Sequence, residues 1–170
     1  MIERTASNRL KQRDQRGFYG DLQDAGVTPS VETRIHRATV SGGPILALLG
    51  IQAGTEIVRR SRRMSGDGQL LQTAVTVFHP NAVSAVPQLA EQDTGPGGMY
   101  ARLEEAGHTL TQQDRVSARV PDPEQQETFD IDGSTALVVI ERVTRGNDGQ
   151  VLEVTHIAAP ADRQTFVYDV

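Results

Sequence analysis

Two polar turns, each lying between two β-rich runs, constrain the fold of this chain more than any other feature. The first turn is Ser65-Gly66-Asp67-Gly68 and the second is Gly146-Asn147-Asp148-Gly149. Asp-Gly and Asn-Asp-Gly sequences supply the backbone angles that tight turns between antiparallel strands require. The flanking runs predict four strands, at residues 56–64, 70–78, 136–144 and 151–158. We therefore expect two β-hairpins within an antiparallel sheet.

Shorter stretches around the hairpins predict the remaining elements. Further strands are expected at residues 31–40, 110–120 and 165–170, and helices at 17–25, 44–49, 99–106 and 122–129. Residues 79–96 contain three prolines and predict a loop with one helical turn near 86–90. Asp122-Pro123-Glu124-Gln125 combines a carboxylate cap, a proline at the first helical position and a glutamine three residues after the cap. The whole pattern predicts an α+β fold, with a single antiparallel β-sheet and short helices packed around it.

The first sixteen residues differ from the rest of the chain. They are polar and basic, so residues 1–16 are expected to form a linker or tail, and residues 17–170 one domain. A domain of this length can bury a full core without metal or disulfide, and the chain has no cysteine. The sequence shows no apolar signal segment and no run of about 18 apolar residues. We expect a cytoplasmic protein with no membrane partner.

Charge and polar motifs argue against a nucleic-acid-binding or catalytic role for these residues. The net charge is −5, from 17 basic and 22 acidic side chains, whereas a nucleic-acid-binding domain usually carries a basic balance. The four histidines lack the spacing of metal ligands, and neither a nucleophile elbow nor a Walker loop occurs. A protein that is not an enzyme, with no metal and no cofactor, is expected.

An arginine cluster in the first hairpin is the most informative polar feature. Because side chains alternate along a strand, Arg60 and Arg62 face one side of the sheet, and Arg59 and Arg63 face the other. A covered pair of guanidinium groups needs acidic partners or an anionic ligand. The residues alone favour a solvated strand face paired with carboxylates, then an anion-binding wall, then a nucleic-acid stripe. Glu153, in the middle of a later strand, is either a partner of these arginines or an acceptor for a polar ligand.

Several stretches follow one another in an order that is typical of a known family. They are Gly17–Gly26 with Thr28-Pro29, Arg60-x-Arg62 running into Asp67-Gly68 and Leu70–Pro80, Gly98–Glu105, Ala118–Phe129, and Glu141–Glu153. This series resembles the effector-binding (UTRA) domain of HutC-type GntR-family bacterial transcription regulators. The resemblance extends from Gly17 to the end of the chain.

The resemblance implies a fold similar to that of chorismate lyase and a small, anionic metabolite as the effector. It also implies a homodimer whose winged helix-turn-helix domains bind DNA and respond to that ligand. No helix-turn-helix pattern precedes Gly17. DNA binding is therefore expected only through a domain that these residues do not contain.

By the same resemblance, Arg60 and Arg62 match arginines that bind the anionic group of the effector, and Glu153 matches a pocket glutamate. Two strand positions that face the pocket and three at its rim are also implied: Thr76, Thr155, Gly17, Tyr19 and Tyr100. Arginine suits this role because its planar fork binds carboxylate or phosphate through two hydrogen bonds.

Two departures from the family pattern bear on the ligand. Relatives that sense sugar phosphates begin the opening helix with a Ser-Phe-Thr-like stretch, where this chain has Gly17-Phe18-Tyr19. The glutamate usual in the second hairpin strand is also absent, since Thr73 and Val75 occupy that region. The first departure favours another anionic or mixed-polarity molecule over a phosphosugar. The alternative function is a chorismate-lyase-like enzyme that acts on a small dianionic substrate, because arginines can serve either role.

Overall fold

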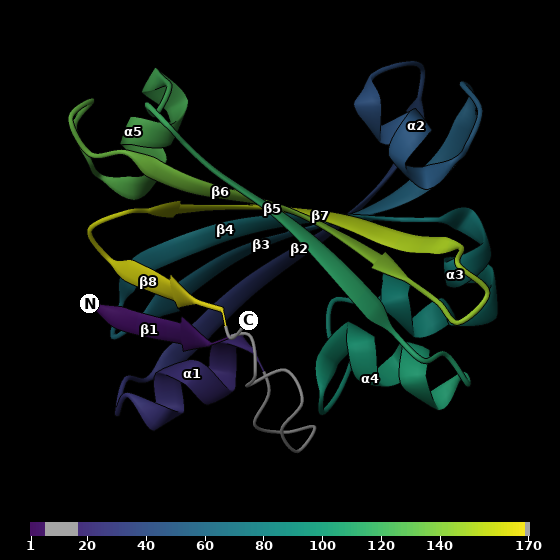
Figure 1. The fold of residues 1–170 in the computed structure, drawn as a ribbon, viewed down its shortest axis with the longest axis horizontal. Coiled ribbons are helices and arrows are strands. Elements are labelled where there is room, and N and C mark those ends of the chain that lie inside the picture. The colour runs from purple at the N-terminus through teal and green to yellow at the C-terminus, as the bar shows by residue number, and fades with distance from the viewer. Residues whose placement is uncertain (6–16, 169–170) are drawn as a thin grey trace.

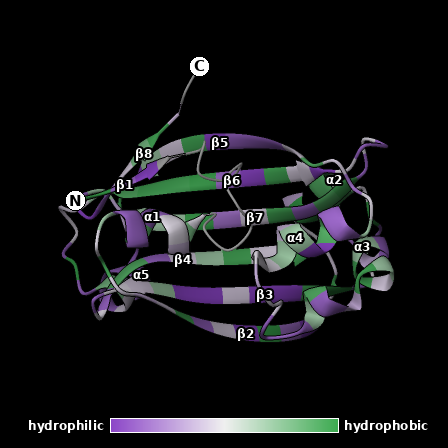
Figure 2. Ribbon diagram, turned by 90° about the horizontal axis from the view of Figure 1, so that it is seen from below, coloured by the Kyte–Doolittle hydropathy of each residue, from purple (hydrophilic) through white to green (hydrophobic). Residues whose placement is uncertain are grey.

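The computed structural model describes residues 1–5 and 17–168, and their main feature is an antiparallel sheet. Within these residues the sheet has six strands in the order β2-β3-β4-β7-β6-β5 (Figures 1 and 2). The strands are β2 (Pro29–Val40), β3 (Thr55–Gly66), β4 (Gln69–Phe78), β5 (Thr111–Arg119), β6 (Leu137–Arg145) and β7 (Val151–Pro160). Both predicted hairpins, β3–β4 and β6–β7, are confirmed, as is the antiparallel α+β fold class.

The turn between β3 and β4 shows why the hairpin signal was strong. Asp67 and Gly68 both have positive φ, at 47° and 83°, as a two-residue hairpin turn requires. The Asp67 carboxylate also accepts a hydrogen bond from the Thr28 backbone N–H at 3.0 Å. A Cβ on the neighbouring Gly66 would lie 2.7 Å from Val27 Cγ1, so this end of the hairpin packs too closely for a larger residue.

Short helices cover both faces of the sheet. They are α1 (Phe18–Asp24), α2 (Pro44–Leu49), α3 (Pro80–Ala85), η3 (Pro87–Ala90), α4 (Gly98–Glu105) and α5 (Pro123–Phe129). Helices α1 and α4 lie on one face and α2 and α5 on the other (Figure 1). The loop expected at 79–96 is partly wrong, because α3 begins at Pro80. His79 caps that helix by accepting a hydrogen bond from the Asn81 N–H at 3.1 Å, a cap that the sequence analysis did not anticipate.

The expectation of a tail at residues 1–16 is wrong for its first residues. Strand β1 (Ile2–Thr5) pairs in parallel with β8 (Gln164–Val167), apart from the six-stranded sheet (Figure 1). Residues 6–16 lie outside the described residues. The physical reason for the error is distance in sequence, because β1 finds its pairing partner at the other end of the chain and shows no local pattern of its own. The single expected sheet is thus accompanied by a two-stranded pair.

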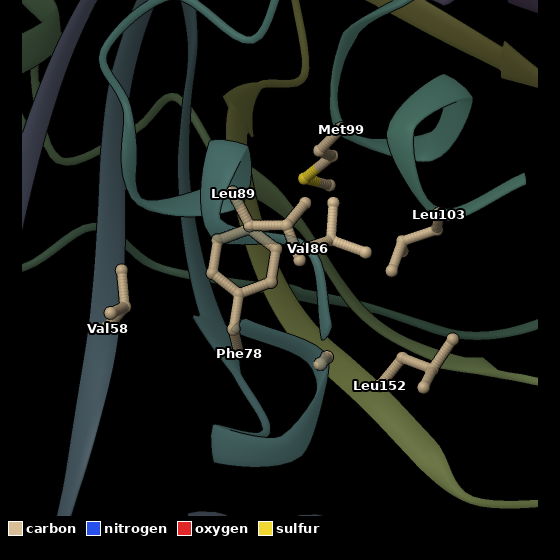
Figure 3. Packing of buried hydrophobic residues seen from close by; sticks show 8 residues of the cluster. Val58, Phe78, Val86, Leu89, Met99, Leu103 and Leu152 are labelled. Carbon is tan, nitrogen blue, oxygen red and sulfur yellow. The ribbon is translucent and has the colours of Figure 1, made fainter. Parts of the chain in front are cut away.

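The core is divided into three clusters of buried side chains. One lies beneath α3, η3 and α4 and includes Phe78, Leu89 and Leu103, each fully buried (Figure 3). A second contains Phe18 and Leu22 from α1, packed against β3, β4, β6 and β7. The third includes Leu49 and lies at α2. The first two clusters belong to the same side of the sheet, and the candidate site lies between them.

The predicted start of α5 gives a direct test of the helix analysis. Asp122 accepts a hydrogen bond from the Gln125 N–H at 2.9 Å, and the Gln125 side chain accepts one from the Asp122 N–H at 3.3 Å. We expect Asp122→Ala to lower the free energy of unfolding by about 1 kcal/mol, because the Gln125 N–H loses its acceptor. Urea denaturation measures the change, and Asp122→Asn, which keeps an acceptor, is the control. Equal loss in both variants would contradict the capping role.

Candidate ligand-binding cavity

One row of polar side chains crosses the middle of the sheet. The strand registers place Arg60 opposite Thr76, Thr76 opposite Thr155, Thr155 opposite Arg142, and Arg142 opposite Asp114. Directly opposed residues of neighbouring strands point to the same face. The row therefore brings two arginines, two threonines and a carboxylate from five strands onto the face that α1 and α4 cover (Figure 2).

A cavity of about 660 Å³ lies over this row, a volume typical of small-molecule sites. Its floor comes from β3, β4, β6 and β7, and the segment 92–100 lines it from the side of α4. Residues of β1, α1 and β8 line the other end, among them Arg4, Phe18 and Phe166. Segments from both ends of the chain thus contribute to one cavity.

Arg60 and Arg62 share this face of β3, as predicted, but their surroundings differ. Arg60 donates to the backbone carbonyls of Glu91 and Gln92 at 2.5 and 2.8 Å, and so ties the 92–100 segment to the sheet. Burial and the charge of Arg62 lower the pKa of Arg60 to about 10. The guanidinium of Arg62 makes one long hydrogen bond, 3.5 Å to Thr76 Oγ1, and its buried Nε atom has no partner among the described residues. Arg62 is therefore the arginine of the cavity whose hydrogen bonds are least satisfied.

Glu153 lies beneath the cavity floor and is fully buried. Its carboxyl accepts hydrogen bonds from the hydroxyls of Thr144, Thr155 at 2.5 Å and Tyr100 at 3.2 Å. Thr155 is also 2.7 Å from the hydroxyl of Thr76. Burial raises the pKa of Glu153, although the hydrogen bonds from Thr144 and Thr155 act in the opposite direction. Glu153 therefore supports the residues that face the cavity.

Arg142 is a cavity residue that the sequence analysis did not select. Its Nε and Nη2 atoms donate to the two carboxylate oxygens of Asp114 at 2.7 and 2.8 Å, and both side chains are more than nine-tenths buried. Burial alone would lower the pKa of Arg142, but the hydrogen bonds to Asp114 outweigh it and the net shift is upward. The sequence analysis could not pair Arg142 with Asp114, because α5 separates β5 from β6 and the predicted hairpin does not fix the register between these two strands.

A second arginine, Arg4, was missed because it lies in the expected tail. Its side chain donates to Asp21 at 2.5 Å, to Gln72 at 2.7 Å and to Gln164 at 3.1 Å. The guanidinium carbon also lies 5.1 Å from the centre of the Phe18 ring. These contacts fix β1 to α1, β4 and β8 at the end of the cavity. Nothing in the local sequence around Arg4 indicates this role.

The structure brings the predicted site residues together but at two depths. Six of them line the cavity: Arg60, Arg62, Thr155, Gly17, Tyr19 and Tyr100. Thr76 and Glu153 are fully buried behind that layer and reach the cavity through Thr155 and Tyr100. Among the described residues, no group of His, Cys, Asp and Glu is arranged to hold a metal ion. No helix in the described ranges is long and apolar enough to cross a membrane.

The buried position of Glu153 predicts a pH-dependent stability. Because its pKa is raised in the folded state, the unfolded chain loses this proton first, near the ordinary value of 4.5. The contribution of Glu153 to the free energy of unfolding is therefore complete below pH 4.5 and is lost as the pH rises through the folded pKa. We expect the stability of the wild type relative to Glu153→Gln to decline over that range in urea titrations. Glu127→Gln, at an exposed position on α5, is the matched control; parallel pH profiles for wild type and Glu153→Gln would contradict the prediction.

Comparison with known proteins identifies a family. The family model of the UTRA domain matches residues 24–165. An HTH-type transcriptional regulator of Streptomyces coelicolor is 25% identical over 162 residues, which cover 92% of this chain and 60% of that protein. The chain thus spans less than two thirds of the length of this relative.

Solved structures show the same fold at low sequence identity. The effector domain of PhnF from Mycobacterium smegmatis matches with a TM-score of 0.78 and 18% identity, covering 99% of both chains. The C-terminal domain of the histidine utilization repressor from Pseudomonas syringae matches with a TM-score of 0.70 and 14% identity, covering 84% of this chain and 99% of that one. The shared architecture includes the sheet that forms the cavity floor.

Proposed function

The chain belongs to the UTRA domain family, and from this premise we propose that it is the ligand-sensing part of a GntR-family transcription regulator. Its ligand is a small anionic metabolite that binds in the cavity between the sheet and α4. The comparisons favour this function over the chorismate-lyase-like enzyme, because both the family and the relative of similar sequence are regulatory.

A single observation carries the proposal: the guanidinium of Arg62 has too few hydrogen-bond acceptors. A cation enclosed by protein is costly unless an acceptor or an opposite charge compensates it. The buried Nε atom of Arg62 has no partner among the described residues, and the hydrogen bond from its Nη2 atom to Thr76 Oγ1 is long, at 3.5 Å. Burial also lowers the pKa of Arg62. A bound anion restores the missing interactions, so the cavity is suited to anions over neutral molecules.

The partners follow from the regulator role. We propose that DNA binding belongs to a winged helix-turn-helix domain of a longer protein, that the protein acts as a homodimer, and that it does so in the cytoplasm. Gly17, Tyr19 and Tyr100, at the cavity rim, and Thr155, at its floor, complete the proposed ligand contacts around Arg60 and Arg62. Ligand binding changes DNA affinity if the two dimer arrangements differ in affinity for the ligand.

A thermal-shift screen tests the sensing role. The chain is titrated with sodium salts of acetate, benzoate, octanoate, glutamate, inorganic phosphate and glucose 6-phosphate at equal ionic strength. We expect a saturable rise in Tm with at least one anion, because a ligand that binds only the folded state stabilises it. The uncharged amide of the best carboxylate, or glucose if a phosphate ester is best, is the control. An equal rise with the uncharged compound, or no rise with any anion at millimolar concentration, would contradict the proposal.

A further inference from the structure

We infer that the ligand of this cavity is an amphipathic monocarboxylate, with one acid group bound at Arg62 and an apolar body of several carbons directed toward α1. This inference rests on the proposed function and specifies the ligand class. It follows from the distribution of charge and apolar surface along the cavity wall.

One of the arginines of the cavity lacks hydrogen-bond acceptors. Four arginines line it, and three of them, Arg4, Arg60 and Arg142, have the short hydrogen bonds described above. Arg62 has only the long contact to Thr76, and its Nε atom has no partner among the described residues. The fork of one guanidinium matches the two oxygens of one carboxylate. The unsatisfied hydrogen-bonding capacity therefore corresponds to a single acid group.

The hydrogen bonds of the neighbouring arginines disfavour a second acid group on the ligand. Arg60 donates to the backbone carbonyls of Glu91 and Gln92, and Arg142 donates to Asp114, so neither guanidinium is available for another carboxylate without losing these bonds. A dianion placed at Arg62 would therefore have one unsatisfied guanidinium for two acid groups. A monoanion is consequently favoured over a phosphate ester or a dicarboxylate.

The floor changes from polar to apolar one row further along the strands. Ile157 follows Thr155 by two residues on β7, and Ile140 precedes Arg142 by two residues on β6. A step of two residues along a strand is about 7 Å. Phe18, Met64 and Phe166 complete this part of the wall and belong to the same apolar cluster. A sugar body placed here would leave hydroxyl groups without partners, whereas methylene or ring carbons gain burial.

The polar groups at the far end of the cavity do not require a second polar group on the ligand. Gln72 accepts from Arg4 at 2.7 Å and donates to Met64 Sδ at 3.0 Å. Gln164 donates to the Leu71 carbonyl at 2.7 Å. Arg4 is held by Asp21 in addition. Because these groups satisfy one another, the far end closes over an apolar tail without needing a charge there.

Isothermal titration of the chain with butanoate, hexanoate, octanoate and decanoate tests the ligand class. We expect the affinity to rise about fourfold per added methylene until the apolar wall is filled. Octanamide, octanedioate and glucose 6-phosphate are each expected to bind at least about tenfold more weakly than octanoate, because each lacks the single charge or the apolar body. In Arg62→Met, octanoate and octanamide are expected to bind equally.

A variant of the apolar wall distinguishes the contribution of the ligand's apolar tail to binding from that of its acid group. Ile157→Asn is expected to flatten the dependence on chain length while keeping the preference for octanoate over octanamide. If this variant does not fold, Ile157→Thr, which is closer in volume, is expected to show a smaller change in the same direction. Tight binding of glucose 6-phosphate or inorganic phosphate, with no chain-length dependence, would overturn the ligand class and leave the sensing function standing. Absence of binding by every anion would overturn both.

Discussion

Replacing Arg62 with methionine is expected to weaken binding of the anionic ligand by about 100-fold or more, because truncating one partner of an enclosed charge pair typically costs 2–5 kcal/mol or about that fold-change. Methionine keeps most of the length of the side chain and removes the guanidinium. The variant is expected to retain the fold, since the Arg62 guanidinium makes only a 3.5 Å hydrogen bond in the free protein. Titration with the anion that gives the largest thermal shift measures the effect.

The same strand provides a matched control. Arg63 is the next residue of β3, faces the opposite side of the sheet and is exposed. Arg63→Met makes the same chemical change away from the cavity, and its affinity is expected to remain within about twofold of the wild type. Similar losses in both variants would show that general charge, and not the cavity, determines binding. Arg60→Met is expected to weaken binding indirectly, because it releases the 92–100 segment from the sheet.

Removing the carboxylate of Asp114 is expected to destabilise the fold by about 3 kcal/mol, the largest effect on stability predicted here. Asp114→Ala leaves Arg142 buried without the acceptor of its two short hydrogen bonds. The hydroxyl of Tyr168, 3.1 Å from Asp114, loses an acceptor as well. The loss of stability arises because the charge of Arg142 remains buried without a partner. Urea denaturation at neutral pH measures the change in the free energy of unfolding.

A double variant distinguishes this explanation from simple loss of packing. Asp114→Leu with Arg142→Met removes both charges and keeps comparable volume, so its stability is expected to lie close to that of the wild type or above it. If the double variant is as unstable as Asp114→Ala, the unpaired charge of Arg142 is not the cause. The variant pair also shows whether the ion pair serves stability or the shape of the cavity floor.

The elements that were predicted correctly are those with local signals. The turn at Asp67-Gly68 and the cap at Asp122 each depend on residues within a few positions, and both are present as expected. The alternation of β3 placed Arg60 and Arg62 on one face for the same reason. The family resemblance supplied Glu153, which spacing alone left open between two roles.

The features that were missed depend on contacts between distant segments. Arg4 meets Gln164, 160 residues away in sequence, and its strand carries no pattern that distinguishes it from a linker. Arg142 meets Asp114 across two strands whose relative register is not visible locally. The sequence also does not show that Arg60 is bound to the protein while Arg62 is left with few acceptors. This difference arises because Arg60 donates to the backbone carbonyls of Glu91 and Gln92, which any residue type would provide.

The parallel pairing of β1 with β8 makes the cavity sensitive to its own N-terminal segment. Arg4 and Phe18 belong at once to the wall of the cavity and to the attachment of β1. A ligand that contacts them changes the free energy needed to detach β1, and by thermodynamic reciprocity detachment of β1 changes the ligand's affinity by the same factor. A chain shortened to begin at Gly17 would lack the four residues of β1. Its ligand affinity would consequently no longer be coupled to the attachment of this strand.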